Sequence, residues 1–248
     1  MYPTLLHIYG PLYIYSYGFM IVLGLVIYSW FTLNNPRHKG IVTTDQFFSI
    51  VSWAIISGLV GGHLLSVITE DPSLESLLSF DGFSILGTII GVIAFLLVYF
   101  AWYRTPVLPL LDFFSAYAPI IQGFGRIGCF LAGCCYGKSS TMPWAITYTN
   151  SAVEAPLCIA LHPSQLYSAL LLFGIAIFLG GWLQYRLKKP GYVFGFYVAL
   201  ISIERFVIDF FRYDHTSLIS PYQVLSLLLL AFSTAWLIAL SYRTYGRK

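Results

Sequence analysis

Charged residues are scarce in this chain of 248 residues, where Asp, Glu, Lys and Arg together make up 9%. A soluble globular domain carries about 25% charged residues, so the chain has too little charge to cover a surface that faces water. Hydrophobic residues make up 58% of the chain, and its mean hydropathy is +0.78. We therefore expect a membrane protein and no nucleic-acid partner.

Lysine and arginine are absent before Arg37. A cleaved signal peptide begins with a positively charged region, and the start of this sequence has none. The first apolar run is therefore expected to stay in the membrane as an anchor.

Seven stretches are long and apolar enough to cross a membrane, which takes about 20 residues in a helix. They predict an all-α polytopic membrane protein, with residues 1–248 forming a single domain of seven transmembrane helices. The predicted helices are Tyr13–Leu33, Phe47–Ile68, Phe83–Tyr103, Asp112–Leu131, Pro163–Gln184, Gly191–Arg212 and Pro221–Tyr242. The longest connection covers about residues 132–162, a length that is typical of functional loops.

The basic residues fall on one side of the predicted bundle. This side holds Arg37, Lys39, Arg104, Arg186, Lys188, Lys189, Arg243, Arg247 and Lys248. The connections on the other side hold only Lys138 among basic residues, and an acidic group at Glu70, Asp71, Glu75 and Asp81. Short loops rich in Lys and Arg stay in the cytoplasm. We therefore expect the N-terminus and the loop at 132–162 outside, and the C-terminus in the cytoplasm.

Ionisable residues within or at the edges of the predicted helices indicate function, because each costs about 2.5–3.5 kcal/mol at the membrane centre. They are Asp112, Arg126, Glu204, Arg205, Asp209 and Arg212. The spacing of Arg205, Asp209 and Arg212 is i, i+4, i+7, which predicts one helical stripe on which Asp209 can pair with either arginine. Two interpretations stay open: ion pairs that tie helices together, or an outer-leaflet anion site in which arginine forks bind a lipid phosphate.

Glycine is concentrated where the fourth predicted helix ends, at Gly123, Gly125, Gly128, Gly133 and Gly137. Glycine permits close backbone approach and unusual dihedral angles. This pattern fits a helix that breaks beside a ligand, and it also fits helices that pack closely for structural reasons alone.

The segment His162-Pro163-Ser164-Gln165 opens the fifth predicted helix from the outer side. Pro163 suits a first helical turn, and we expect the side chains of Ser164 and Gln165 to cap free backbone amides. His162 would lie at the membrane interface and titrate near neutral pH. It is interpreted either as a base or as a structural residue.

Only four cysteines are present, Cys129, Cys134, Cys135 and Cys158, and all map to the outer side. The chain lacks a Cys-x-x-Cys pair, which argues against a thiol redox protein. No histidine stands at ligand spacing from the cysteines, so we expect no metal and interpret them as small packing residues. A disulfide between Cys158 and an earlier cysteine stays open.

Two long motifs carry a family resemblance. The segment Gly125-Arg126-Ile127-Gly128-Cys129-Phe130-Leu131-Ala132-Gly133-Cys134-Cys135-Tyr136-Gly137 resembles the signature of prolipoprotein diacylglyceryl transferases. The segment His162-Pro163-Ser164-Gln165-Leu166-Tyr167 resembles that family's next motif. Tyr17-Gly18, Gly61-Gly62, and Arg205 with Asp209 and Arg212 also stand where the family has counterparts, so the resemblance covers nearly the whole chain.

The resemblance implies transfer of a diacylglyceryl group from phosphatidylglycerol to the lipobox cysteine of a preprolipoprotein signal peptide. It places this reaction in the outer half of the bacterial cytoplasmic (inner) membrane and implies no cofactor. The residues then expected to be catalytic are Tyr17, Arg126, Arg205 and His162, with both arginines at the lipid head group. Those expected to bind substrate are Gly125, Gly128, Gly137, Ser164, Gln165, Asp209 and Arg212, with Asp209 orienting Arg205.

Several positions depart from the family pattern. Leu86 stands where a His-Gly-Gly sequence has its histidine, and a leucine cannot accept a proton. His63 replaces a usual arginine, Cys129 and Ala132 replace common asparagines, and Ser168 replaces a usual glutamate. Tyr17, His63 and His162 are the candidate substitutes for the histidine. The alternatives are a divergent lipid-binding relative with altered or lost transferase activity, and a membrane thiol redox protein.

Overall fold

The computed structural model describes the chain except for residues 1, 10–11, 37–39, 71–82, 215–218 and 246–248. Two compact units are formed, one by Met1–Arg37 with Leu111–Lys248 and the other by His38–Leu110. Of the charges used to predict topology, Arg37, Lys39, Asp71, Glu75, Asp81, Arg247 and Lys248 lie outside the described residues.

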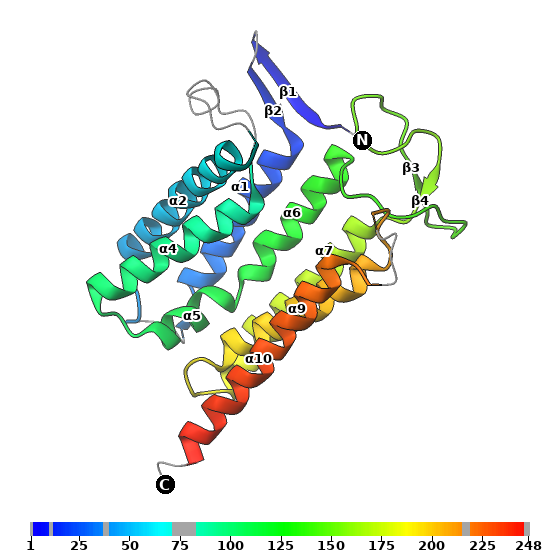
Figure 1. The fold of residues 1–248 in the computed structure, drawn as a ribbon. Helices are drawn as coiled ribbons and strands as arrows, with labels where there is room; N and C mark the ends of the chain where they lie inside the picture. Colours follow the sequence, from blue (N-terminus) through cyan, green and yellow to red (C-terminus); the bar gives the residue numbers. More distant parts are fainter. Residues whose placement is uncertain (1, 10–11, 37–39, 71–82, 215–218, 246–248) are drawn as a thin grey trace. The chain divides into compact units, whose positions relative to one another are not determined.

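The larger unit is built from helices that pack in the sequence α1, α6, α7, α9, α10 (Figure 1). Their bounds are α1 Ser16–Leu33, α6 Ala118–Ala132, α7 Ser164–Ala176, α9 Tyr192–Asp209 and α10 Pro221–Tyr245. A π-helical stretch, η2 (Ile177–Leu183), and the short α8 (Gln184–Arg186) continue α7. The helix α5 (Val107–Ser115) precedes α6.

Glycine explains how closely α1 approaches α6. A Cβ atom added at Gly24 would lie 2.8 Å from Cβ of Phe124, and one added at Gly128 would lie 3.2 Å from Cα of Tyr17. At Gly125 the nearest atom is Cδ1 of Ile21, at 3.3 Å. Small residues let two helix backbones approach in lipid, where dispersion replaces the hydrophobic effect as the driving force.

The smaller unit is a helical pair, α2 (Thr44–Glu70) and α4 (Ile85–Tyr103). The start of α2 is capped reciprocally, since the Thr43 amide donates to Oε1 of Gln46 at 3.0 Å and the Gln46 amide donates to Oγ1 of Thr43 at 3.2 Å. Gly61 and Gly91 lie at the crossing, where a Cβ added to Gly91 would be 2.2 Å from the carbonyl oxygen of Ser57.

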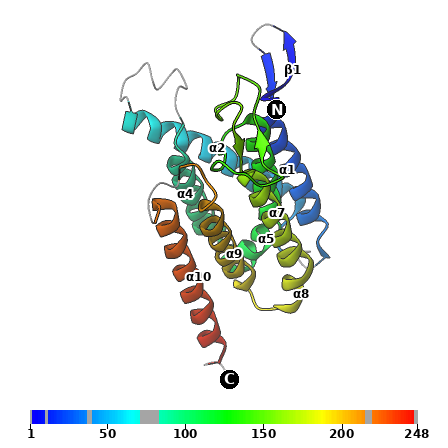
Figure 2. The ribbon, with the colours of Figure 1, turned by 90° about the vertical axis from the view of Figure 1, so that its right-hand side faces the viewer.

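The segment between α6 and α7 forms a small layer of its own. Tyr148, Ala155 and Leu161 are its buried core, and β3 (Ile146–Thr147) pairs antiparallel with β4 (Ala160–Leu161). A second hairpin, β1 (Thr4–Tyr9) with β2 (Leu12–Tyr15), leads into α1. Both lie at one end of the larger unit, and α10 ends at the opposite end (Figures 1 and 2).

Asp112, one of the charged residues within the predicted helices, has a structural role. Its carboxylate accepts hydrogen bonds from the backbone amides of Gly191, at 2.7 Å, and Phe194, at 2.8 Å. These amides belong to the first turn of α9, where the helix dipole also favours a negative charge. Asp112 therefore fixes the start of α9.

The structure confirms a polytopic membrane protein, with six helices of the described chain long and apolar enough to span. They are Ser16–Leu33, Thr44–Thr69, Leu86–Tyr103, Val107–Ala132, Ser164–Arg186 and Pro221–Tyr242. The remaining predicted span, Gly191–Arg212, corresponds to α9, which is helical but carries Glu204, Arg205 and Asp209 within 18 residues. Its predicted end at Arg212 is wrong, because the helix ends at Asp209.

The α2–α4 crossing gives a stability prediction. Gly91→Ala should push the helices apart, because its new Cβ meets a backbone carbonyl that cannot rotate away, and overpacking of this kind costs about 1–3 kcal/mol. Gly174→Ala is the matched control, since a Cβ at Gly174 meets nothing within 4 Å. Thermal unfolding in detergent should show a lower Tm for Gly91→Ala only. Equal Tm values for the two variants would contradict the close approach.

Candidate active site

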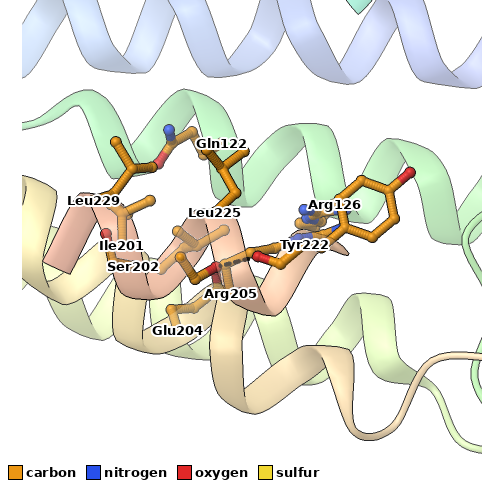
Figure 3. A pocket seen from close by; sticks show the side chains of 11 residues that line it. Gln122, Arg126, Ile201, Ser202, Glu204, Arg205, Tyr222, Leu225 and Leu229 are labelled. Atoms are coloured by element: carbon orange, nitrogen blue, oxygen red, sulfur yellow. Dashed lines mark hydrogen bonds between the residues drawn. The ribbon is translucent and has the colours of Figure 1, made fainter. Parts of the chain in front are cut away.

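A pocket of about 200 Å³ lies within the larger unit among α6, α7, α9 and α10 (Figure 3). Its polar lining contains one arginine from α6, and one arginine and one carboxylate from α9. Its apolar lining comes mainly from α9 and α10. The lining residues are Gln122, Arg126, Leu172, Ile201, Ser202, Glu204, Arg205, Tyr222, Leu225, Ser226 and Leu229.

Arg126 and Arg205 bring two positive charges to this pocket. The guanidinium carbon of Arg205 lies 4.9 Å from the centre of the Tyr222 ring, close enough for a cation–π interaction. Arg126 lines the same pocket from α6 (Figure 3). Within the described part of the chain, neither arginine forms an ion pair. The structure therefore brings together both arginines that the sequence assigned to a head group.

Glu204 is the negative charge of the pocket, and it was not among the site residues predicted from the sequence. Its side chain is 6% exposed, and its Oε1 accepts a hydrogen bond from the hydroxyl of Ser168 on α7. Ser168 is the position where the resembling family has glutamate. A carboxylate is thus present at this place, supplied by α9 instead of α7. In the sequence, the only sign of this exchange was the serine at position 168 in place of the family's glutamate. That Glu204 is the partner of Ser168 becomes visible only when α7 packs against α9.

Asp209 is buried, at 1% exposure, and its Oδ2 accepts a hydrogen bond from the hydroxyl of Ser220. Ser220 also starts α10, because its Oγ accepts from the Gln223 amide at 3.1 Å while Gln223 Oε1 accepts from the Ser220 amide at 3.1 Å. Asp209 therefore joins the end of α9 to the start of α10. In this position it fixes the helices that carry Arg205 and Tyr222.

Arg212 lies beyond the end of α9, so the predicted stripe of three ionised residues is wrong at this position. Its guanidinium binds the Asp214 carboxylate through two hydrogen bonds of 2.9 Å, Nε to Oδ1 and a terminal nitrogen to Oδ2. Arg212 holds the pKa of the Asp214 carboxyl below its usual value. A turn closed by the Arg212 amide on the Asp209 carbonyl, at 3.1 Å, redirects the chain.

Gly137 lies at a crowded backbone crossing. It forms a bridge with Arg212, and a Cβ added to it would lie 2.4 Å from the His162 carbonyl oxygen and 2.8 Å from that of Phe211. The amide of Lys138 donates to the Phe211 carbonyl, at 2.9 Å, and the amide of His162 donates to the Lys138 carbonyl, also at 2.9 Å. Only glycine allows these three chain segments to meet.

His162 lies in an aromatic cluster beside this crossing and does not line the pocket. Its Nδ1 is 3.2 Å from the hydroxyl of Tyr167, which also accepts a hydrogen bond of 2.7 Å from Nε1 of Trp144. Its ring centre is 5.6 Å from that of Phe211. His63 on α2 and Leu86 on α4 belong to the smaller unit and do not line the pocket either.

Ser164 and Gln165 hold the loop that follows α6. The hydroxyl of Ser164 donates to the Cys135 carbonyl at 3.2 Å, and Nε2 of Gln165 donates to the Cys134 carbonyl at 2.7 Å. The expectation that they cap free amides of α7 is therefore wrong, because both bonds go to carbonyl groups elsewhere. The two side chains are 1% and 2% exposed.

The four cysteines are free thiols, so the disulfide left open for Cys158 is not formed. Cys129, Cys134 and Cys135 lie together at the end of α6, whereas Cys158 is exposed. Tyr17, in the first turn of α1, is 46% exposed and interacts electrostatically with these three thiols and with Arg126. Gly125 and Gly128 face α1 from α6.

Comparison with known proteins gives one consistent result. The family model described as prolipoprotein diacylglyceryl transferase matches residues 3–239. A phosphatidylglycerol–prolipoprotein diacylglyceryl transferase of Clostridium tetani is 38% identical over 236 residues, covering 92% of this chain and 93% of the relative. Transferase 2 of Clostridium perfringens is 36% identical over 88% of this chain and 87% of its own length. The transferase of Idiomarina loihiensis is 28% identical over 85% and 80%.

The contact between Arg205 and Tyr222 gives a prediction for the pocket. Tyr222→Leu removes the ring and should destabilise the protein by about 0.5–2 kcal/mol through the lost cation–π interaction. Tyr222→Phe keeps the ring face and is the matched control. Tm measured in detergent should fall for Leu and stay near the parent value for Phe. An equal fall for both variants would show that the hydroxyl, rather than the ring face, matters.

Proposed function

We propose that this chain, which belongs to the prolipoprotein diacylglyceryl transferase family, transfers a diacylglyceryl group from phosphatidylglycerol to a cysteine thiol of a prolipoprotein, releasing glycerol phosphate. The proposed acceptor is the lipobox cysteine of the signal peptide. The observation that carries the proposal is the pocket in which Arg126 and Arg205 converge. The names of the relatives favour this transferase over a lipid-binding relative without activity and over a thiol redox protein.

The chemistry requires an anion to leave. The acceptor sulfur forms a bond to the glyceryl carbon, and the bond from that carbon to the phosphate oxygen breaks. The electron pair of this bond departs with glycerol phosphate. Donors fixed around the phosphate stabilise the charge that develops on it, and they do so most strongly where water is excluded. Arg126 and Arg205 have the planar forks that bind phosphate through paired hydrogen bonds.

Glu204 lowers the net positive charge of this pocket. Two guanidinium groups and one carboxylate leave a single excess positive charge, which suits a phosphodiester of charge minus one. Glu204 is fixed by Ser168 and cannot swing across the pocket without losing that hydrogen bond. We assign it to holding the arginines apart and oriented when no lipid is bound.

The other expected residues lie outside the lining of this pocket. Asp209 positions α9 against α10, and Gly125 and Gly128 bring Tyr17 to α6. Gly137, Ser164 and Gln165 shape the loop after α6, to which Arg212 is joined by its bridge with Gly137. His162 is the proposed proton acceptor on the outer layer. Tyr17 is proposed to contact the substrates near Arg126.

We also propose that α9 is a seventh spanning helix, with the N-terminus outside and the C-terminus in the cytoplasm of the bacterial inner membrane. Two spanning helices, α7 and α10, pack against α9. The β1–β2 hairpin and the layer after α6 share one end of the larger unit, while α10 ends at the other (Figure 1). This arrangement agrees with an outside N-terminus and an outside loop at 132–162.

The topology is tested by labelling with a membrane-impermeant thiol reagent in intact cells, in a Cys158→Ser background. Ser139→Cys should be labelled from outside, because position 139 belongs to the proposed outer layer. Lys188→Cys should be labelled only after the cells are opened, because it lies in a basic connection. Both positions are exposed. Labelling of position 188 but not of position 139 in intact cells would reject the orientation.

The phosphate-binding role is tested by replacing each arginine fork with a point charge. Arg126→Lys and Arg205→Lys should each reduce turnover by about 10²–10³-fold, the usual cost of losing a donor to a developing anion, with little change in Tm. Arg186→Lys is the matched control, because Arg186 also lies over an aromatic ring, that of Trp182 at 5.6 Å, but outside the pocket. Turnover can be followed by mass spectrometry of a lipobox peptide. If both pocket variants turn over like the parent, the assignment of Arg126 and Arg205 to an anion site is contradicted.

A further inference from the structure

Three thiols converge where α6 ends. The Sγ atoms of Cys129, Cys134 and Cys135 all lie within 4.8 Å of one another. Cys129 belongs to the last turn of α6, and the other two follow its end. The cluster joins no other His, Cys, Asp or Glu among the residues that the structure describes.

The backbone that brings the thiols together is unusual. Gly133 ends α6 with φ of 72°, and Cys135 has φ of 57°, a left-handed conformation that residues with a Cβ atom rarely adopt. The amide of Cys134 returns to the Cys129 carbonyl at 3.1 Å. Strained conformations of this kind persist where surrounding contacts fix them, and they are frequent at functional sites.

Buried side chains fix this loop from the side of α7. Ser164 and Gln165 donate to the carbonyls of Cys135 and Cys134, as described above, and Gln165 also donates to the hydroxyl of Tyr148 at 3.2 Å. Both side chains are almost fully buried. The loop that carries Cys134 and Cys135 is therefore fixed through its backbone carbonyls, which leaves these hydrogen bonds independent of the thiols.

We propose that Cys129, Cys134 and Cys135 bind a Zn²⁺ ion. Zinc–thiolate bonds of about 2.3 Å in a tetrahedron place the sulfur atoms about 3.8 Å apart, which lies within the observed limit of 4.8 Å. A donor set of thiolates alone selects soft ions such as zinc over magnesium or calcium. A cation is also favoured at this place, because the carbonyls at the C-terminus of a helix carry partial negative charge.

Nearby arginines balance the charge of such a site. Three thiolates and one Zn²⁺ carry a net charge of minus one. Arg212 interacts with Cys135, and Arg126 interacts electrostatically with Cys129. Arg126 and Cys129 are three residues apart on α6, a spacing that places both side chains on the same face of the helix. The metal would therefore lie beside the arginine that faces the phosphate pocket.

Three protein ligands leave the fourth position of a tetrahedral zinc ion open, as in catalytic sites. Resting on the proposed transferase function, we assign this position to the acceptor thiol. The thiol proton passes to the proposed proton acceptor, His162, and coordination gives a zinc-bound thiolate. Its sulfur then bonds to the glyceryl carbon as the carbon–oxygen bond to the phosphate breaks. Zinc keeps its charge throughout, and the thioether product is a weak ligand that dissociates.

The metal site can be tested without an activity assay. The full-length protein, purified in detergent with a reductant and no chelator, should contain one zinc per chain by elemental analysis. Replacement by Co²⁺ should give the intense thiolate-to-metal charge-transfer absorption of a tetrahedral site. Cys129→Ser, Cys134→Ser and Cys135→Ser should each weaken metal binding by more than about 100-fold. This is more than the loss of affinity that follows when a residue that only supports a metal ligand is replaced. Cys158→Ser is the matched control and should bind like the parent.

Thiol counting gives a second measurement that does not depend on variants. A thiol reagent should modify only Cys158 in the zinc-loaded protein, and all four cysteines after a chelator is added. Reaction of all four thiols regardless of zinc, or a disulfide within the cluster in protein that retains no metal, would overturn the proposal. So would copper in place of zinc in the purified chain.

Addition of a lipobox peptide separates the metal site from its catalytic role. If the open position takes the acceptor, the Co²⁺ spectrum should change with the cysteine peptide and not with its serine analogue. An unchanged spectrum in a protein that binds zinc and turns over would overturn the acceptor-binding step and leave the transferase function intact. A peptide-dependent change without any diacylglyceryl transfer would support the site and reject the transferase function.

Discussion

Two positive charges that face one pocket are the constraint around which the larger unit is organised. Arg126 and Arg205 face one pocket, and within the described chain neither is neutralised by an ion pair. The free-energy cost of burying these two positive charges is reduced by the ring of Tyr222, which lies under Arg205. It is reduced further by the carboxylate of Glu204, which is held by a hydrogen bond from Ser168. A lipid phosphate would offset the remaining charge. The site is thus electrostatically incomplete without an anion, which is the state expected of a phospholipid-binding site.

The elements that place these arginines are themselves held by buried polar contacts. Asp112 fixes the start of α9, and Asp209 with Ser220 fixes its end against α10. The glycines of α6 allow α1 to approach, which brings Tyr17 near Arg126. Leaving one member of a buried polar contact unpaired costs more than the contact itself contributes. These contacts therefore fix the geometry of the helices that carry the two arginines.

Much of this arrangement could be predicted from the sequence. Counting apolar runs placed Arg126 and Arg205 within predicted helices, and the motifs named the family. The end of α9 was not accessible, because the apolar pair Phe210 and Phe211 continues the pattern past the turn that stops the helix at Asp209. Contacts between helices, such as Ser168 with Glu204, depend on packing that periodicity does not encode. The three-thiol cluster depends on left-handed turns at Gly133 and Cys135, which spacing alone does not reveal.

The central claim is that an anion site built from two arginines supports transfer from a phospholipid to a thiol although Leu86 cannot accept a proton. Purified protein incubated with phosphatidylglycerol and a lipobox peptide tests it most directly, with mass spectrometry of the peptide as the readout. A peptide that gains one diacylglyceryl group on its cysteine, together with free glycerol phosphate, is the predicted result. Protein that binds phosphatidylglycerol but leaves the peptide unmodified at every pH would contradict it.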